Sequence, residues 1–264
     1  MAQLFLALLG LAVGAVINVL ADDLPHRTEF RQPRCPACDQ RYTPLQWVAV
    51  VAFLSGRGRC GFCDASLALR RVLVEIVSAL MLVLLYDKFG PTIKFLLLAM
   101  LLEGLWLITI IDFEHRLILY ATIFPMIGIA VLYGLFGANR GLTRTLIGGL
   151  VGFGVVYLIY LLGWVFGAVA ARTRGEPLSE IPFGGGDVNL AGVIGLAVGW
   201  SGILLSLFIT VMTGGLGALI YVLFMSSRRR YDAFTPIPYG PFLVLGAVVL
   251  LVFDAEIRQY FAGS

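Results

Sequence analysis

Charge is scarce in this chain of 264 residues: 13% of the residues are charged, whereas 59% are hydrophobic. A typical soluble domain carries about 25% charged residues, so the composition excludes an ordinary soluble protein. The net charge of only +3 gives no reason to expect a nucleic-acid partner. With a mean hydropathy of +0.93, the chain is predicted to be an integral membrane protein.

Long stretches with little or no charge recur along the sequence. They are residues 3–21, 72–86, 95–111, 117–136, 146–171, 188–227 and 235–253. One membrane helix needs roughly 20 apolar residues, so residues 188–227 must contain two helices, and the cluster Thr213-Gly214-Gly215 predicts the turn between them. The expected fold class is an all-α polytopic membrane protein with about eight transmembrane helices. The continuous runs exclude the short alternating strands of a barrel.

Basic residues in the loops predict the orientation, because Lys and Arg favour the cytoplasmic side. The loops after the first, third, fifth and seventh spans hold 8, 1, 2 and 3 basic residues, or 14 of the 19. That face is predicted to be cytoplasmic, with both termini outside the cytoplasm. No basic residue precedes the first span, which favours a retained helix over a cleaved signal peptide.

All four cysteines lie in one hydrophilic segment, residues 22–71, as Cys35-Pro-Ala-Cys38 and Cys60-Gly-Phe-Cys63. A two-residue spacer lets both thiolates of a pair reach one tetrahedral ion, and two such pairs complete a structural Zn²⁺ site. The alternative is two disulfides or free thiols. Disulfides are rare in a reducing cytoplasm, so the sequence predicts zinc with a structural role.

Two acidic residues differ from the rest by their position at span ends. Asp112 follows the apolar run 95–111, and Asp187 follows Gly184-Gly185-Gly186 and opens the next run. The predicted orientation places both at the cytoplasmic membrane boundary. Two adjacent carboxylates can share one proton, so that one acts as a base toward water and the other as an acid. This chemistry is that of an aspartyl protease, and the alternative is two ordinary interfacial acids.

Gly184, Gly186 and Asp187 match a GxGD signature. Motifs that accompany this signature over nearly the full chain are Gly14, Asn18, Val19, Pro25, both cysteine pairs, Arg70, Glu75, "IDFEHRLI" around Asp112 and "PYGPFL" at 238–243. In this set of motifs the chain resembles the bacterial type IV prepilin leader peptidases. The resemblance implies that Asp112 and Asp187 are the catalytic pair, which removes the basic leader from prepilins or pseudopilins at the cytoplasmic face of the bacterial inner membrane.

The expected organisation therefore has three parts. Residues 1–21 form the first transmembrane helix, residues 22–71 the cytoplasmic zinc loop, and residues 72–264 the membrane-embedded protease core. Many relatives also methylate the new N-terminus with S-adenosylmethionine, and this second activity is implied by the resemblance alone. The expected partners are a prepilin or pseudopilin and the membrane lipid.

The sequence also departs from the family pattern. Asn189 stands where relatives have Lys, and the lack of a cation there is expected to disfavour ionisation of the acid pair. Asp23, Leu119 and Tyr120 are further departures, which indicate a divergent member. A non-cutting pilin assembly factor and an ion transporter stay open as alternatives, although the transporter is disfavoured by acids at one membrane face. Glu75 and Glu103 have no partner that the sequence can assign.

Overall fold

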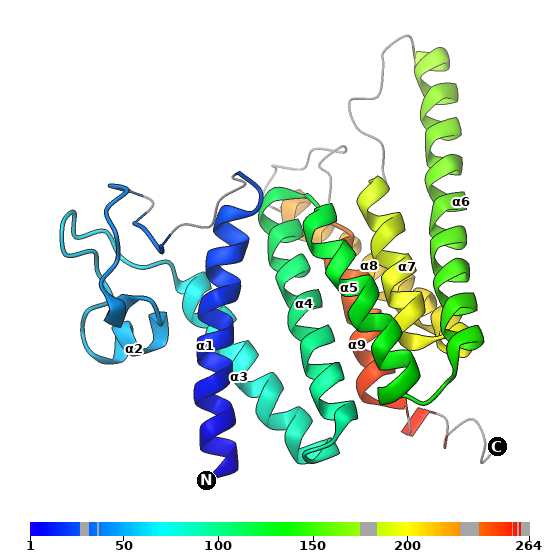
Figure 1. Cartoon of the computed structure of the whole chain (residues 1–264). Helices are drawn as coiled ribbons and strands as arrows, with labels where there is room; N and C mark the ends of the chain where they lie inside the picture. The colour runs from blue at the N-terminus through cyan, green and yellow to red at the C-terminus, as the bar shows by residue number, and fades with distance from the viewer. Residues whose placement is uncertain are drawn as a thin grey trace. The chain divides into compact units, whose positions relative to one another are not determined.

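The computed structural model of the protein describes residues 1–26, 32–35, 37–174, 184–227, 238–254, 256–257 and 259, with side chains left out at 166–174 and 227. Within these ranges the regular structure is helical, with two isolated β-bridges and no strand. The chain divides into two compact units, Met1–Ala99 and Met100–Ser264 (Figure 1). The prediction of an all-α fold is thus confirmed for the described residues.

The first unit is built on a pair of antiparallel helices, α1 and α3. Its elements are α1 (Ala2–Asp23), a 3₁₀ turn η1 (Pro44–Gln46), α2 (Ala49–Leu54) and α3 (Leu69–Phe89). A Cβ at Gly14 would lie 2.5 Å from the Cα of Glu75, and a Cβ at Gly10 would meet the Cα of Ala79. Small residues four apart therefore let the two backbones approach closely, as in many membrane helix pairs.

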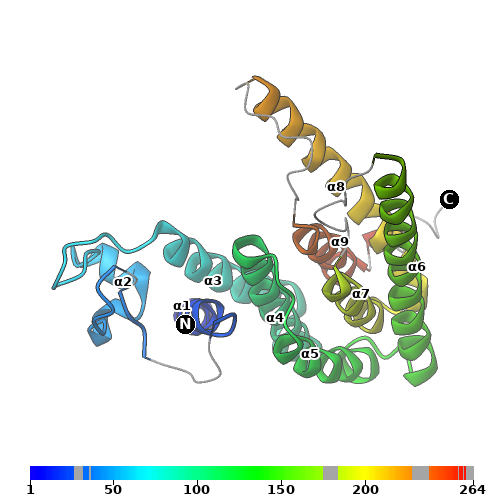
Figure 2. The ribbon, with the colours of Figure 1, turned by 90° about the horizontal axis from the view of Figure 1, so that it is seen from above.

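The second unit packs its helices around α7. Its elements are α4 (Ile93–His115), which begins in the first unit, α5 (Tyr120–Leu132), the π-helical turn η2 (Tyr133–Gly137), α6 (Leu142–Arg174), α7 (Gly185–Val198), α8 (Trp200–Ser227) and α9 (Gly240–Val252). Nine of the 14 residues of α7 are buried, and α7 contacts α5, α6, α8 and α9 (Figure 2). This helix, which carries Asp187, is therefore the core of the unit.

The contact between α6 and α7 depends on glycine. A Cβ at Gly195 would meet the carbonyl oxygen of Gly148, and a Cβ at Gly152 would meet that of Ala191. The two backbones therefore touch, and the side chains of Leu196 and Phe153 pack against glycines of the facing helix beside this contact.

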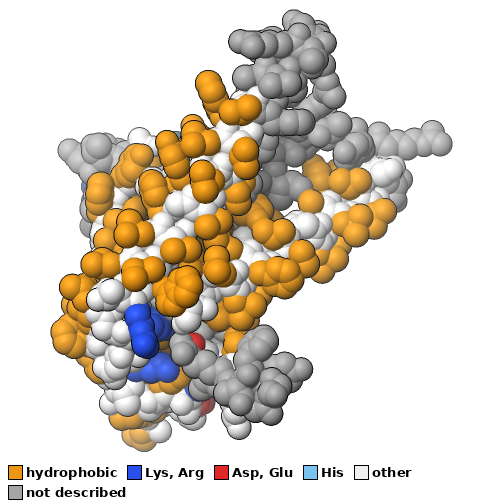
Figure 3. Space-filling model, turned by 90° about the vertical axis from the view of Figure 1, so that its right-hand side faces the viewer, with side chains coloured by type: hydrophobic (Ala, Val, Ile, Leu, Met, Phe, Trp, Pro, Cys, Tyr) orange, Lys and Arg blue, Asp and Glu red, His pale blue; other side chains and the backbone are white. Residues whose placement is uncertain are grey.

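Five of the described helices are long and apolar enough to cross a membrane. They are Ala2–Asp23, Ile93–His115, Tyr120–Gly137, Leu142–Val165 and Trp200–Ser226, and Gly185–Val198 and Gly240–Val252 are shorter apolar helices. On the face that includes α6, many of the exposed side chains are hydrophobic (Figure 3), and they include Leu150, Leu158 and Leu162. The protein is a multi-pass membrane protein, and the count of eight spans stays a prediction.

The predicted turn at Thr213-Gly214-Gly215 is wrong. The α8 helix runs unbroken through these residues, and the break lies at Gly199, between α7 and α8. Gly199 has a φ of +76°, which a glycine adopts without strain. A Cβ at Gly214 would lie 3.1 Å from the ring of Tyr239, so this glycine serves the packing of an aromatic side chain.

The contact between Gly195 and Gly148 predicts that one added methyl group lowers the stability of the protein. Gly195→Ala should destabilise the protein by about 1–3 kcal/mol, because the new Cβ overlaps the main chain of Gly148. Thermal unfolding in detergent micelles would show a lower Tm. The matched control is Gly154→Ala in α6, where a Cβ meets nothing within 4 Å. Equal melting temperatures of the two variants would contradict the proposed tight contact.

Candidate functional site

Asp112 lies in the last turn of α4 and is 5% exposed. Its Oδ2 accepts a hydrogen bond of 3.0 Å from the backbone N–H of Gly240, the first residue of α9. A Cβ at Gly240 would lie 2.5 Å from that same oxygen. Gly240 therefore supplies both the donor and the space in which the carboxylate sits.

Asp187 lies in the first turn of α7 and is 9% exposed. Its Oδ2 accepts a hydrogen bond of 3.1 Å from the backbone N–H of Gly184, the residue before the helix. The first N–H groups of a helix have no partner within the helix, and a negative charge there interacts favourably with the helix dipole. Asp187 thus caps its own helix.

The structure brings the two acids into one neighbourhood. A Cβ at Gly186 would lie 2.7 Å from the Cβ of Ile118, which packs the start of α7 against the segment that follows α4. Asp112 accepts its hydrogen bond from the first residue of α9, and α9 packs against α7. The ends of α4, α7 and α9 therefore meet at one place.

The remaining residues of the predicted acid site, Gly184 and Asn189, have local roles in α7. Gly184 is the N-cap of α7, with φ and ψ of −84° and 150°. Asn189 Nδ2 donates a hydrogen bond of 3.1 Å to the carbonyl oxygen of Gly185, one turn earlier in the same helix. The amide of Asn189 is thus engaged with its own helix, and its predicted influence on the acid pair stays a prediction.

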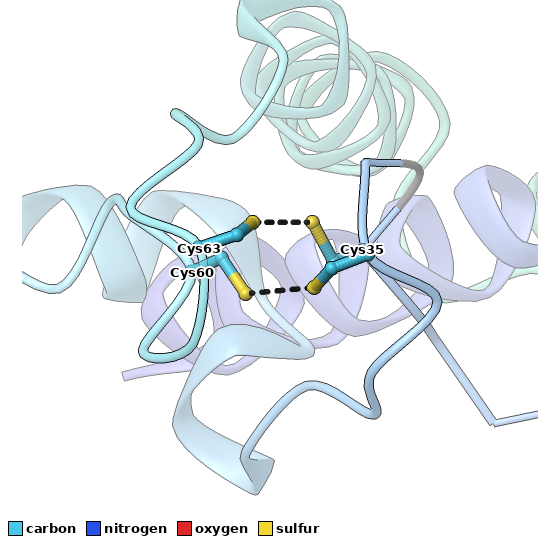
Figure 4. Close-up of side chains that lie close together, drawn as sticks. Cys35, Cys60 and Cys63 are labelled. Atoms are coloured by element: carbon cyan, nitrogen blue, oxygen red, sulfur yellow. Dashed lines mark hydrogen bonds between the residues drawn. The ribbon is translucent and has the colours of Figure 1, made fainter.

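The four cysteines form a second site, wholly within the first unit. Their sulfur atoms all lie within 4.8 Å of one another, with Cys35 and Cys63 3.6 Å apart and Cys38 and Cys60 3.7 Å apart (Figure 4). Four sulfurs at 2.3 Å from a tetrahedral Zn²⁺ would be about 3.8 Å apart, whereas a disulfide needs about 2.0 Å. The cysteines are free, and their arrangement fits a tetrahedral ion.

The two cysteine pairs share one local fold. Arg34–Asp39 and Arg59–Asp64 are ion pairs of 3.0 and 2.8 Å at equivalent positions. Both aspartates have positive φ, +55° and +57°, which Asp tolerates better than most residues. The sequence signal for this shared fold is the pattern Arg-Cys-x-x-Cys-Asp, which occurs twice. The spacing of the cysteines alone does not reveal the role of the flanking Arg and Asp.

Backbone groups in these turns point at sulfur. Burial opposes ionisation of the Cys35 thiol, yet hydrogen bonds from the backbone N–H groups of Ala37 and Cys38 lower its pKa from 9.0 to about 6. The N–H of Gln40 lowers the pKa of Cys38, but burial and the three other sulfurs raise it to about 12. Like charges in the cluster compete, so a bound cation is what would allow all four thiols to ionise together.

Glu75 connects the cysteine loop to the helix pair of the first unit. This fully buried side chain lies in α3. Its two oxygens accept hydrogen bonds of 2.7 and 2.8 Å from the backbone N–H groups of Ala49 and Val50, at the start of α2. Arg71, also in α3, stacks 5.3 Å above the ring of Tyr42 in the loop. The loop therefore packs as one body with α1 and α3.

The fold and the two sites define a multi-pass α-helical membrane protein with two buried acids at helix ends and a separate four-cysteine cluster. Two family models match the chain, the "Bacterial Peptidase A24 N-terminal domain" over residues 8–89 and the "Type IV leader peptidase family" over residues 96–220. The chain belongs to the type IV leader peptidase family, which confirms the resemblance seen in the sequence.

Curated relatives cover nearly the whole chain. The prepilin leader peptidase/N-methyltransferase of Stutzerimonas stutzeri is 27% identical over 256 residues, which cover 97% of this chain and 80% of that protein. The protein of the same name from Pseudomonas aeruginosa is 27% identical over 284 residues, or 97% of this chain and 93% of that protein. That from Burkholderia pseudomallei is 26% identical, with 98% and 88% covered. No solved structure matches the chain significantly.

No role could be assigned from the sequence to two residues of these sites, Glu75 and Gly240. Glu75 had no assignable partner, because Ala49 and Val50 are 26 and 25 residues away. Gly240 stood only within the matching stretch "PYGPFL". The available signal was a glycine between two prolines directly before an apolar run, at Pro238, Gly240 and Pro241.

The carboxylate of Glu75 should stabilise the start of α2. In Glu75→Gln the charge is lost and the amide NH₂ faces a backbone donor, so α2 should open more easily by about 1.5–3 kcal/mol, or roughly 10- to 100-fold. Hydrogen exchange of peptides that cover residues 49–54 would measure this opening. Asp87→Asn, at the other end of α3, is the control, and equal exchange in both variants would contradict the anchoring role.

Proposed function

We propose that Asp112 and Asp187 form the catalytic pair of a membrane endopeptidase that removes the basic leader peptide from type IV prepilins or pseudopilins. The observation that carries the proposal is the position of two buried acids at neighbouring helix ends, since Asp112 binds the start of α9 and α9 packs against the helix of Asp187. Both lie within residues 96–220, the part that matches the leader peptidase family. The names of the relatives, prepilin leader peptidase/N-methyltransferase, support the substrate class.

The two carboxyls can divide the work of peptide hydrolysis between them. Two like charges in a poorly solvated site do not both ionise readily, so the pair shares one proton. The ionised member takes a proton from the attacking water, and the protonated member donates one to the peptide as its bond breaks. In the described part of the chain, Oδ2 of each carboxyl accepts a backbone hydrogen bond, and we assign Oδ1 of each to water or peptide.

The orientation places this chemistry on the cytoplasmic side. Here α3, α7 and α9 join the five long apolar helices as spans, which gives eight, and the cysteine loop, the end of α4 and the start of α7 share one face. Both termini are then outside the cytoplasm, in a protein of the bacterial inner membrane. Arg228–Arg230 lie outside the described residues, as do the side chains of Arg172 and Arg174. A prepilin would present its leader on this face, with its apolar helix still in the membrane.

The cysteine loop, within the predicted segment 22–71, would hold one structural Zn²⁺. Cys35, Cys38, Cys60 and Cys63 supply four sulfurs in a near-tetrahedral arrangement, which is the donor set of a closed structural site. The ion would stabilise a loop whose own core is small, with Tyr42, Ala49, Ala52 and Leu67 as its buried residues besides cysteine. Such a site leaves no coordination position for catalysis.

N-methylation is a second activity that the relatives' names contain. It would require S-adenosylmethionine as the methyl donor. Within the described ranges, no group of side chains can be assigned to this donor, so the activity stands on the relatives' names alone.

The acid pair predicts that neither member can be replaced. Asp112→Asn and Asp187→Asn should each abolish leader cleavage, because each acid has its own proton to transfer. The measurement is cleavage of a prepilin by the purified protein in proteoliposomes, with thermal unfolding to show that each variant is folded. Glu114→Gln, close to Asp112 in the chain, is the control. A folded variant that cleaves at the full rate would refute the assignment and leave the assembly factor as the alternative.

Replacement of Gly240 should lower the cleavage rate, although this residue has no side chain. Gly240→Ala places a Cβ 2.5 Å from Asp112 Oδ2, and the resulting displacement of the carboxylate should lower the cleavage rate by about 100-fold. Gly215→Ala in α8 is the matched control, since a Cβ there meets nothing within 4 Å. If both variants cleaved prepilin at the same rate, the contact between Gly240 and Asp112 would have no part in the reaction.

The purified protein should contain one zinc ion per chain. Elemental analysis would measure it, and replacement of any one of the four cysteines by Ser should lower the zinc content and the Tm. A chelator strong enough to remove the ion should do the same. Protein without zinc that carries a Cys–Cys crosslink in mass spectrometry would favour the disulfide alternative.

A further inference from the structure

Ion pairs in the first unit mark the level at which its helices leave the membrane. Asp22, in the last turn of α1, pairs with Arg70 and Arg71 at the start of α3, the latter at 2.7 Å. Charged residues at the ends of membrane helices lie at the interface with water. The level of these ion pairs along α1 and α3 therefore marks the membrane surface within the first unit.

The start of α2 lies on the membrane side of the ion pairs formed by Asp22. Glu75 follows Arg71 by four residues, which is about 6 Å along α3, and it lies opposite Gly14 of α1, well before Asp22. The N–H groups of Ala49 and Val50 bind Glu75 directly, so they share its depth. Figure 1 shows α2 beside α1 rather than beyond its C-terminal end.

One side of α2 is apolar and exposed. Ala49 and Ala52 face the core of the loop and are 1% and 0% exposed, whereas Val51 and Leu54 are 40% and 85% exposed. Trp47, 42% exposed, lies just before the helix, two residues ahead of its first residue. Large exposed apolar side chains gathered around a short helix indicate a surface that is covered by something other than water.

The neighbouring residues indicate what covers this face. Leu69 and Leu73, at the start of α3, are also exposed, at 69% and 62%, so the apolar surface of α3 extends to the depth of α2. Arg57 and Arg59, three and five residues after the end of α2, are exposed, and Arg59 also pairs with Asp64. An apolar face with Trp, followed by Arg, is typical of helices that lie in the interface of a membrane with anionic lipids.

We propose that α2 is an interfacial helix and that its exposed apolar residues Val51 and Leu54, with Trp47 just before the helix, insert into the lipid bilayer. Arg57 and Arg59 contact anionic headgroups beside it. The four-cysteine loop is thereby attached to the membrane surface on two sides, through Glu75 to α3 and through α2 to lipid. This attachment does not depend on the peptidase activity.

The proposal is tested by crosslinking from defined positions of the full chain. The photoreactive residue p-benzoylphenylalanine replaces Val51 or Leu54, with the exposed polar Gln40 of the first cysteine turn as the matched control. The variants are reconstituted in vesicles of phosphatidylethanolamine and phosphatidylglycerol and irradiated. Mass spectrometry should find lipid adducts at positions 51 and 54 and only background at 40. Adducts to residues 100–264, to a second copy of the chain, or to no partner would overturn the proposal.

A charge on the same face gives a second, independent measurement. Leu54→Asp should release α2 from lipid and make trypsin cleavage after Arg57 and Arg59 about tenfold faster in the same vesicles, because an Asp is strongly disfavoured in the membrane. Ser66→Asp, exposed in the second cysteine turn, should leave cleavage unchanged. If Leu54 faced water, its replacement would leave the cleavage rate nearly unchanged, as for most exposed substitutions. Equal cleavage of both variants would therefore refute the insertion of α2.

Discussion

A helix that begins inside a membrane protein exposes backbone N–H groups that water cannot satisfy, and in this chain buried carboxylates accept them. Glu75 binds the first two N–H groups of α2, and Asp112 binds the first of α9. Asp187 binds the N–H that precedes α7. An unsatisfied N–H in hydrocarbon is disfavoured by several kcal/mol. Each carboxylate thus fixes where a helix starts, and the start of α7 and of α9 in turn fixes the candidate active site.

The glycines of the second unit also help to position the candidate active site. The contact of Gly195 with Gly148 sets the height of α7 against α6, and Gly186 packs its start against Ile118. No larger residue fits at either position, because a Cβ would overlap the main chain of Gly148 or the side chain of Ile118. Asp187 is therefore held by the packing of the whole length of its helix, and Asp112 by a helix 128 residues further along the chain.

The sequence allowed the fold class to be predicted, because the length and continuity of apolar runs depend only on the solvent around a helix. It did not locate the break between α7 and α8. Thr213-Gly214-Gly215 and Gly199 look alike in sequence, and only the ring of Tyr239 against Gly214 distinguishes packing from a turn. The cysteine site follows from local spacing and was predictable. The partners of Glu75 and Asp112 were not, since each is an N–H group that every residue except proline carries.

The short helix α7 has a consequence for the supply of water. With 14 residues, α7 is about 21 Å long, whereas the hydrocarbon core is about 30 Å thick. Because α7 is enclosed by α5, α6, α8 and α9, its first turn would lie below the membrane surface among neighbouring helices rather than against lipid. Asp187, in that turn, would then depend on water that enters between these helices. A hydrolytic reaction at the end of a membrane helix needs that supply, because water is one of its two substrates.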